Sequence, residues 1–168
     1  MGELFAKTQR LVTHLELRDT YGTSHPDFQD WAAGVPVQEI VRRGRLDPWN
    51  DLVRSHVDRG VIFRRARIIS TPPSDYIRFE HAITPYSNLV GGELVRWLDR
   101  SRARDIAVSP CDFWQFDDHL VCWVYQTGDG EKAGHELSDD PREVKLCSAA
   151  FEAVWDRAID HEKFALPA

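Results

Sequence analysis

Two short stretches of the sequence place chemically active side chains close together. In the first, His14, Glu16 and Arg18 alternate, and Asp19 and Tyr21 follow. On an extended segment this alternation would direct the first three side chains to one side. A histidine beside a carboxylate can act as a general base, and an arginine can hold an anion. The pattern permits two interpretations, a small enzyme that uses His14 with Glu16 or Asp19, or a buried polar network.

A second stretch, residues 75–81, combines aromatic, basic and acidic side chains. It holds Tyr76, Arg78 and Glu80, and a further basic and aromatic group lies downstream at 96–100. Such side chains can line a pocket for a polar or anionic ligand, although a helix-surface ion pair with core aromatics explains them equally well. With two residues of a later strand, the predicted ligand-binding residues are Arg18, Tyr21, Tyr76, Arg78, Glu80, Arg96, Trp97, Arg100, Asp112 and Trp114.

The cysteines and histidines give no sign of a metal site. Structural zinc sites need close ligand pairs, whereas Cys111, Cys122 and Cys147 are widely separated. His119 and His135 could join Cys111 or Asp112 in a site, but nothing in their spacing requires it. The sequence also lacks a Gly-x-Ser-x-Gly nucleophile elbow and a Gly-x-x-x-x-Gly-Lys phosphate loop. We therefore expect no metal and no cofactor, and we expect the cysteines to be buried as small hydrophobic residues.

Length and composition restrict the class of protein. The 168 residues suit one domain over positions 1–168, and 42% hydrophobic with 29% charged residues is typical of a soluble globular protein. No apolar run is long enough to span a membrane, and the first residues do not resemble a signal peptide. Only three cysteines favour a location in the reducing cytoplasm. The net charge of −6 disfavours direct nucleic-acid binding, and the arginine clusters at 42–45 and 100–104 are expected to be solvated or paired.

Capping residues and hydrophobic spacing locate the helices. The clearest helix has Asp140 as N-cap and Glu143 in a capping box. Asp47 similarly caps a helix that Gly60 ends, and Ser74 can cap another. Helices are therefore predicted from Leu4 to near Thr13, where the chain becomes extended, and over 26–33, 48–59, 74–83 and 141–159.

The strands follow from apolar runs between turn signals. Arg64 and Arg65 are expected to interrupt the first strand, and Asp117 and Asp118 are expected to form a tight turn between two later ones. The pattern predicts an α+β fold, a single domain with a mixed or antiparallel sheet flanked by helices. The predicted strands cover residues 61–69, 94–98, 112–116 and 120–125, with a short strand that ends near Leu137.

Four motifs, in order along the chain, carry a resemblance to a known family. They are HLELRDTY at 14–21, SDYIRFE at 74–80, DFWQFDD at 112–118 and AFEAVW at 150–155. The chain resembles the actinobacterial domain-of-unknown-function proteins often found beside helix-turn-helix regulators, over residues 1–159. This resemblance implies a regulatory protein that works with a separate helix-turn-helix partner.

The second half of the chain is also similar to the phospholipase D-like fold. Catalysis in that family needs His-x-Lys-x-x-x-x-Asp, with histidine as nucleophile and lysine as phosphate ligand. When the motif is aligned on the aspartates at 117–118, the histidine and lysine positions hold either Pro110 and Asp112 or Cys111 and Phe113. The resemblance therefore implies a phospholipase D-like half domain that has lost its phosphodiester chemistry.

These observations favour a non-catalytic regulatory or ligand-sensing domain. It would bind a small polar or anionic ligand through the residues named above, and it would reach DNA only through a helix-turn-helix regulator protein. The alternative is a small cytoplasmic enzyme of specialised metabolism, in which His14 with Glu16 or Asp19 supplies acid–base catalysis.

Overall fold

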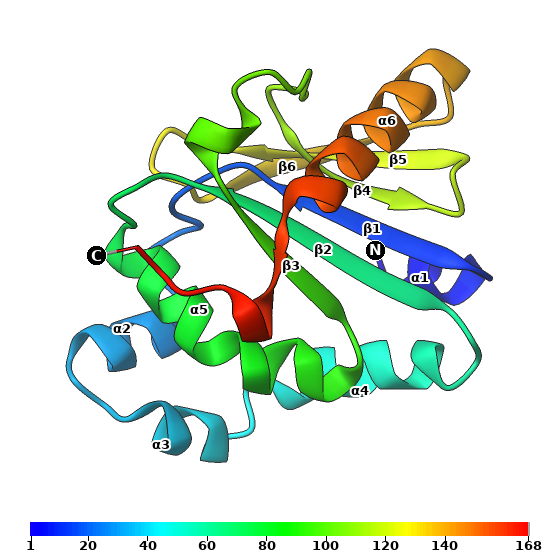
Figure 1. Ribbon diagram of the computed structural model, residues 1–168. Coiled ribbons are helices and arrows are strands. Elements are labelled where there is room, and N and C mark those ends of the chain that lie inside the picture. The colour runs from blue at the N-terminus through cyan, green and yellow to red at the C-terminus, as the bar shows by residue number, and fades with distance from the viewer. Residues whose placement is uncertain (168) are drawn as a thin grey trace.

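A seven-stranded mixed sheet forms the centre of the molecule in the computed structural model, which describes residues 1–167 (Figure 1). The strand order is β6-β5-β4-β1-β2-β3-β7. Three central strands are parallel, and the remaining four run antiparallel to their neighbours. The strands are β1 (Leu11–Glu16), β2 (Ile62–Ile69), β3 (Leu94–Asp99), β4 (Asp112–Phe116), β5 (Leu120–Gln126), β6 (Lys132–Ser138) and β7 (Ile159–Asp160).

Helices cover both faces of this sheet. Most lie on the face drawn below the sheet in Figure 1, the lower face, and one long helix crosses the upper face. The lower helices are α1 (Gly2–Lys7), α2 (Pro26–Ala32), α3 (Val37–Arg42), α4 (Asp47–Val57) and α5 (Asp75–Ser87). The upper helix is α6 (Pro141–Arg157), and three short 3₁₀ helices are η1 (Leu89–Gly91), η2 (Arg100–Ala103) and η3 (His161–Lys163). The predicted α+β class with a mixed sheet is confirmed.

The hydrophobic core has a layer on each side of the sheet. Under α6, Phe151 and Val154 pack against sheet residues such as Leu15 and Phe113. On the lower face, aromatic and aliphatic residues of α1 and α4 pack on β1, β2 and β4. Cys122 lies in the lower layer and Cys147 in the upper one, so both are buried as predicted, whereas Cys111 is half-buried.

Local sequence signals explain several element boundaries. The Ser74 hydroxyl accepts a hydrogen bond from the Ile77 amide at 3.1 Å, which confirms the predicted start of α5. Asp117 and Asp118 both have positive φ and form the predicted tight turn between β4 and β5. The Asp117 carboxylate also accepts hydrogen bonds from the amides of residues 9–11, so this turn is tied to the start of β1.

Two predictions about the central strands were wrong. The first helix ends at Lys7 rather than near Thr13, so the extended segment predicted after Thr13 is present but begins earlier, as β1 over residues 11–16, which is buried along its whole length. Because helices cover both faces of a central strand, its apolar residues do not alternate and can be mistaken for a helix. Arg64 and Arg65 do not interrupt β2, because they project to opposite faces and each has a carboxylate partner.

Boundary predictions at the helices also need correction. Glu143 does not form a capping box, because it accepts a hydrogen bond from the Trp123 indole at 2.7 Å. Asp47 is the first residue of α4 rather than its cap. The last helix ends at Arg157, and Ile159 pairs with β3 in the unpredicted strand β7. The remaining differences are the unpredicted helix α3 and the extension of α5 from residue 83 to 87.

Candidate functional site

A network of buried charged side chains lies on the lower face between β1, β2 and α5. The parallel register pairs Glu16 with Arg67 and places Arg65 on the same face of β2. Glu16 accepts hydrogen bonds from both guanidinium groups. On the far sides, Arg65 Nε lies 2.8 Å from Glu93 Oε1, and Arg67 Nη2 lies 2.7 Å from Glu80 Oε2. Each buried charge therefore has a partner of opposite sign, as removal from water requires.

His14 belongs to the same network. Its ring stacks on Trp114 with centroids 3.7 Å apart, and its Nδ1 lies 3.4 Å from Glu16 Oε1. Burial, together with the nearby Arg65, holds the pKa of His14 well below its usual range. Burial alone would raise the pKa of Glu16, but Arg65 and Arg67 lower it well below its usual range. At neutral pH His14 is therefore uncharged and Glu16 is ionised, within a buried polar network.

Arg18, which the sequence predicts on the same side as His14 and Glu16, follows the end of β1. β1 ends at Glu16, so the alternation of a strand does not extend to Arg18. The Arg18 guanidinium instead donates to the carbonyls of Thr127 and Gly128, both at 3.0 Å. This contact links the end of β1 to the loop between β5 and β6.

The second predicted group does not converge on one pocket. Glu80 belongs to the buried network, and Tyr76 packs among aromatic rings of the lower helices. Trp97 is fully buried in β3, and Arg78 is half-buried on α5. Arg96 projects to the upper face, where its Nε lies 2.7 Å from a carboxylate of β7. Neighbouring residues of a strand point to opposite faces, which separates the arginine from the tryptophan.

Asp112 and Tyr21 lie near the carboxyl end of β1, because the antiparallel pairing places the first residue of β4 there. The Asp112 carboxylate accepts hydrogen bonds from the Leu17 amide at 2.9 Å and from Gln126 Nε2 at 3.1 Å. The Tyr21 hydroxyl accepts one from the Arg18 amide at 3.1 Å. Burial raises the pKa of Asp112 to about 6. Both side chains thus have partners inside the protein.

Arg100 is fixed at the carboxyl ends of the parallel strands. Its Nη2 donates to the carbonyls of Leu17 at 2.7 Å and Ile68 at 3.0 Å, and its Nε donates to Ser70 Oγ at 3.0 Å. Nη2 also lies 3.2 Å from Asp19 Oδ2, so Asp19 is held by Arg100 and Ser70 rather than by the histidine of β1. Within residues 1–167, Arg100 Nη1 has no hydrogen-bond acceptor.

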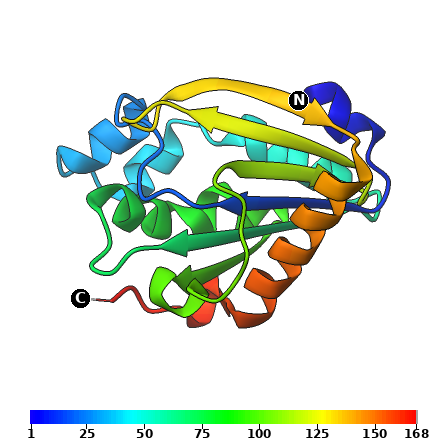
Figure 2. The same cartoon turned by 90° about the horizontal axis from the view of Figure 1, so that it is seen from above.

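A pocket of about 410 Å³ opens beside this arginine. The segment 104–111 leaves η2, crosses over β1 and β2 and leads into β4 (Figure 2). Because this segment forms one wall of the pocket, we call the pocket the crossing-loop pocket. Of the predicted ligand-binding residues, only Arg100 contributes to its lining. Ligands of open sheets commonly bind beyond the carboxyl ends of parallel strands. In the sequence, the feature that marks this pocket is the arginine cluster at 100–104, which supplies two of its lining residues. The lining residues are Leu17, Ile68, Arg100, Ala103, Arg104, Ile106, Val108, Ser109 and Pro110.

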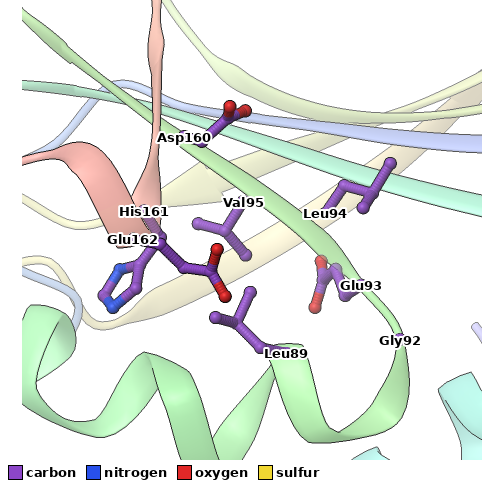
Figure 3. Close-up of a pocket in the computed structure, with 8 residues that line it drawn as sticks. All are labelled: Leu89, Gly92, Glu93, Leu94, Val95, Asp160, His161 and Glu162. Carbon is purple, nitrogen blue, oxygen red and sulfur yellow. The ribbon is translucent and has the colours of Figure 1, made fainter.

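A second pocket, of about 400 Å³, lies beside β3 and β7 (Figure 3). Its acidic side chains are Glu93, Asp160 and Glu162, and none of the predicted ligand-binding residues lines it. Glu93 is already engaged by Arg65, and Asp160 by Arg96. Carboxylates dominate this pocket, so it is unsuited to an anion.

Neither a metal site nor a membrane-spanning helix is found among residues 1–167. In the part of the chain from residue 1 to 167, no group of three or more His, Cys, Asp or Glu side chains is arranged to hold a metal ion. Over the same residues, the helices are too short or too polar to cross a membrane.

Comparison with known proteins places the chain in a family. The model of the family described as "Domain of unknown function (DUF6879)" matches residues 1–166. The chain belongs to this family. No curated protein sequence matches it.

Solved structures show the fold of this DUF6879 chain more specifically. It is similar to Nuc, a phospholipase D family member from Salmonella typhimurium, with a TM-score of 0.50, 11% identity, and coverage of 95% of this chain and 86% of that one. It is also similar to NucT from Helicobacter pylori, with a TM-score of 0.49, 11% identity, and coverage of 95% and 87%. The predicted likeness to the phospholipase D fold is confirmed and extends beyond the second half to almost the whole chain.

Proposed function

We propose that this protein is a non-catalytic ligand-sensing domain that acts with a separate DNA-binding regulator. The observation that carries the proposal is Arg100, whose guanidinium is held in place by main-chain carbonyls beside an open pocket. Main-chain carbonyls and the Ser70 hydroxyl fix its position, and the Asp19 carboxylate, 3.2 Å from Nη2, is its one anionic partner among residues 1–167. Its Nη1, which has no acceptor within residues 1–167, is free to donate to a ligand. A small polar or anionic molecule suits such a group.

The residues around the pocket support a non-catalytic role. In both alignments of the phospholipase D motif, the positions of histidine and lysine are filled by the run from Pro110 to Phe113. The pocket lining contains no histidine and no lysine. Its one hydroxyl group, on Ser109, donates to the Cys111 carbonyl and has no base beside it in the lining. Nothing there can act as an activated nucleophile.

The acid–base enzyme considered from the sequence has less support. His14 is only 7% exposed, its ring is covered by Trp114, and its Nδ1 faces Glu16 rather than an open pocket. Asp19 is held elsewhere, by Ser70 and Arg100. A general base must reach the proton that it abstracts, and this arrangement offers a substrate no such approach.

The partner in the proposal is a helix-turn-helix regulator protein. Its support is the net charge of −6, which disfavours direct contact with DNA, and the resemblance to proteins found beside such regulators. A pull-down of the tagged chain from its own host, without crosslinking, tests this part by mass spectrometry. We expect a stoichiometric helix-turn-helix protein in the eluate. An eluate that contains only this chain would overturn the regulatory part of the proposal.

The ligand-sensing part is tested by thermal shift with a panel of small anions, run on wild type, Arg100→Ala and Arg142→Ala. Arg142 is a matched control because it is an exposed arginine on α6, paired only with Asp140. We expect at least one anion to raise the melting temperature of wild type and of the control but not of Arg100→Ala. No shift with any anion, or hydrolysis of a phosphodiester by the wild type, would overturn the proposal.

A further inference from the structure

The crossing-loop pocket has one charged end, and that end is built rigidly. Arg100 donates to two main-chain carbonyls and to Ser70 Oγ at distances of 2.7–3.0 Å, so its guanidinium cannot swing away without losing all three bonds. Of its three nitrogens, Nη1 alone has no acceptor in the described part of the chain and so keeps both hydrogens for a ligand. An anion that binds here meets a donor already in position, which reduces the entropy lost on binding.

The rest of the pocket is mostly apolar. The strand ends contribute Leu17 and Ile68, and the crossing segment contributes Ile106, Val108 and Pro110. The Val108 side chain is 37% exposed although it belongs to this apolar wall, so part of the wall remains open to solvent. Burial of such surface by an apolar ligand group is favourable.

The hydrogen-bond donors that line the pocket restrict the charge of the anion that it can bind. A phosphate dianion is usually held by several amides or by more than one fixed cation, whereas of the two arginines in this lining only Arg100 is fixed by several hydrogen bonds, and it already pairs with Asp19. Arg104 is exposed and already donates to the Ser101 carbonyl at 2.9 Å. The Asp19 carboxylate, 3.2 Å from Arg100 Nη2, opposes a second negative charge. A monoanion with one compact charged group therefore fits better than a phosphate.

We infer that the crossing-loop pocket binds a monocarboxylate with an apolar body, such as a medium-chain or aryl-substituted acid. This inference rests on the proposed ligand-sensing function and names its ligand class. The carboxylate accepts hydrogen bonds from Arg100 Nη1, and the hydrocarbon part lies under the crossing segment against Ile68 and Ile106. The volume of about 410 Å³ lies within the range of small-molecule pockets.

Isothermal titration calorimetry of the full chain tests the inference with sodium octanoate and sodium phenylacetate. Acetate, octanol and inorganic phosphate serve as probes that lack the apolar body, the charge or the carboxylate. We expect at least one of the two amphipathic acids to bind, and each of the three comparison probes to bind at least about 10-fold more weakly, a difference of about 1.4 kcal/mol.

Two variants locate the binding. Arg100→Gln removes the cation, and Val108→Asp places a negative charge in the apolar wall at a position that is 37% exposed. We expect each to weaken binding of the acid at least about 10-fold, while the control Arg142→Ala leaves it unchanged. Binding that both variants leave intact, or inorganic phosphate that binds as tightly as octanoate, would overturn the inference.

The outcome also separates the inference from the proposed function. If an anion stabilises the chain through Arg100 but Val108→Asp and the apolar body have no effect, the ligand-sensing role stands and the ligand class is wrong. If no anion binds at all, both are wrong.

Discussion

Arg65 of β2 and Arg100 at the start of η2 both reach polar partners inside the protein, but their charges are compensated differently. Arg65 lies between two carboxylates, those of Glu16 and Glu93, within a region that is almost fully buried. Arg100 is held by carbonyls and a hydroxyl, with one carboxylate at its edge, and it borders an open pocket. Carboxylates cancel the charge of a guanidinium, whereas neutral acceptors only position it. The first arrangement therefore serves the fold, whereas the second, with one carboxylate instead of two, is the one proposed to bind a ligand.

The largest effect is expected when the buried network is broken. Arg65→Met leaves the Glu16 and Glu93 carboxylates buried with fewer partners, and loss of one partner of a buried pair costs about 3–5 kcal/mol. Equilibrium unfolding in urea at pH 7 measures the change in the free energy of unfolding. A loss below about 1 kcal/mol is what an exposed salt bridge contributes, and it would show that the buried network does not stabilise the fold.

Asp112 provides a second test of the difference between charges paired with an opposite charge and charges held by neutral groups. It is a buried carboxylate with no salt-bridge partner among residues 1–167. Its raised pKa, about 6, means that the folded chain holds the proton longer than the unfolded chain, whose carboxyl titrates near 3.9. The contribution of Asp112 to stability is therefore greatest at acidic pH and falls as pH rises from about 4 to about 6.

Asp112→Asn keeps the shape of the side chain and removes this titration. We expect the stability of the variant relative to wild type to improve by up to about 3 kcal/mol between pH 4 and pH 7. Urea unfolding of both proteins across that range measures the difference. A difference that does not change with pH would mean that folding does not raise the pKa of Asp112.

The smallest effect is expected at Arg100. Its substitution by alanine removes hydrogen bonds at the exposed carboxyl ends of β1 and β2, so the free energy of unfolding should fall by only about 1 kcal/mol. The same urea experiment used for Arg65→Met measures it. A loss as large as that of Arg65→Met would make Arg100 a structural residue and remove the contrast between the two regions.

Much of the fold could be predicted from local signals. Ser74 caps an amide three residues away, and Asp117 and Asp118 form a turn through their own backbone angles. Because these interactions are local, the sequence alone predicts them. The predicted break of β2 at Arg64 and Arg65 was wrong because the carboxylate partners of these arginines are distant in the sequence. Arg65 pairs with Glu93, twenty-eight positions away, and a charged residue without a visible partner suggests a break in a strand.

The candidate site was less predictable for the same reason. Arg100 could be identified from its sequence cluster, but the pocket beside it joins the ends of β1 and β2 to residues 103–110. Those apolar residues have no special spacing, and their common location follows only from the parallel order of the strands. Arg96 and Trp97, which are adjacent in the sequence, were separated by the alternation of β3 onto opposite faces.

The position of β1 at the centre of the sheet determines the order in which the chain can assemble. β1 pairs with β2 on one side and with β4, about one hundred residues later in the chain, on the other. During synthesis at roughly 5–20 residues per second, β1 and β2 wait for seconds before the β4–β5 hairpin arrives. Such distant pairing slows folding, and the waiting strand presents an open edge to other chains. Closure by this hairpin is therefore the late step of assembly, and a chain truncated before Asp112 would keep an aggregation-prone edge.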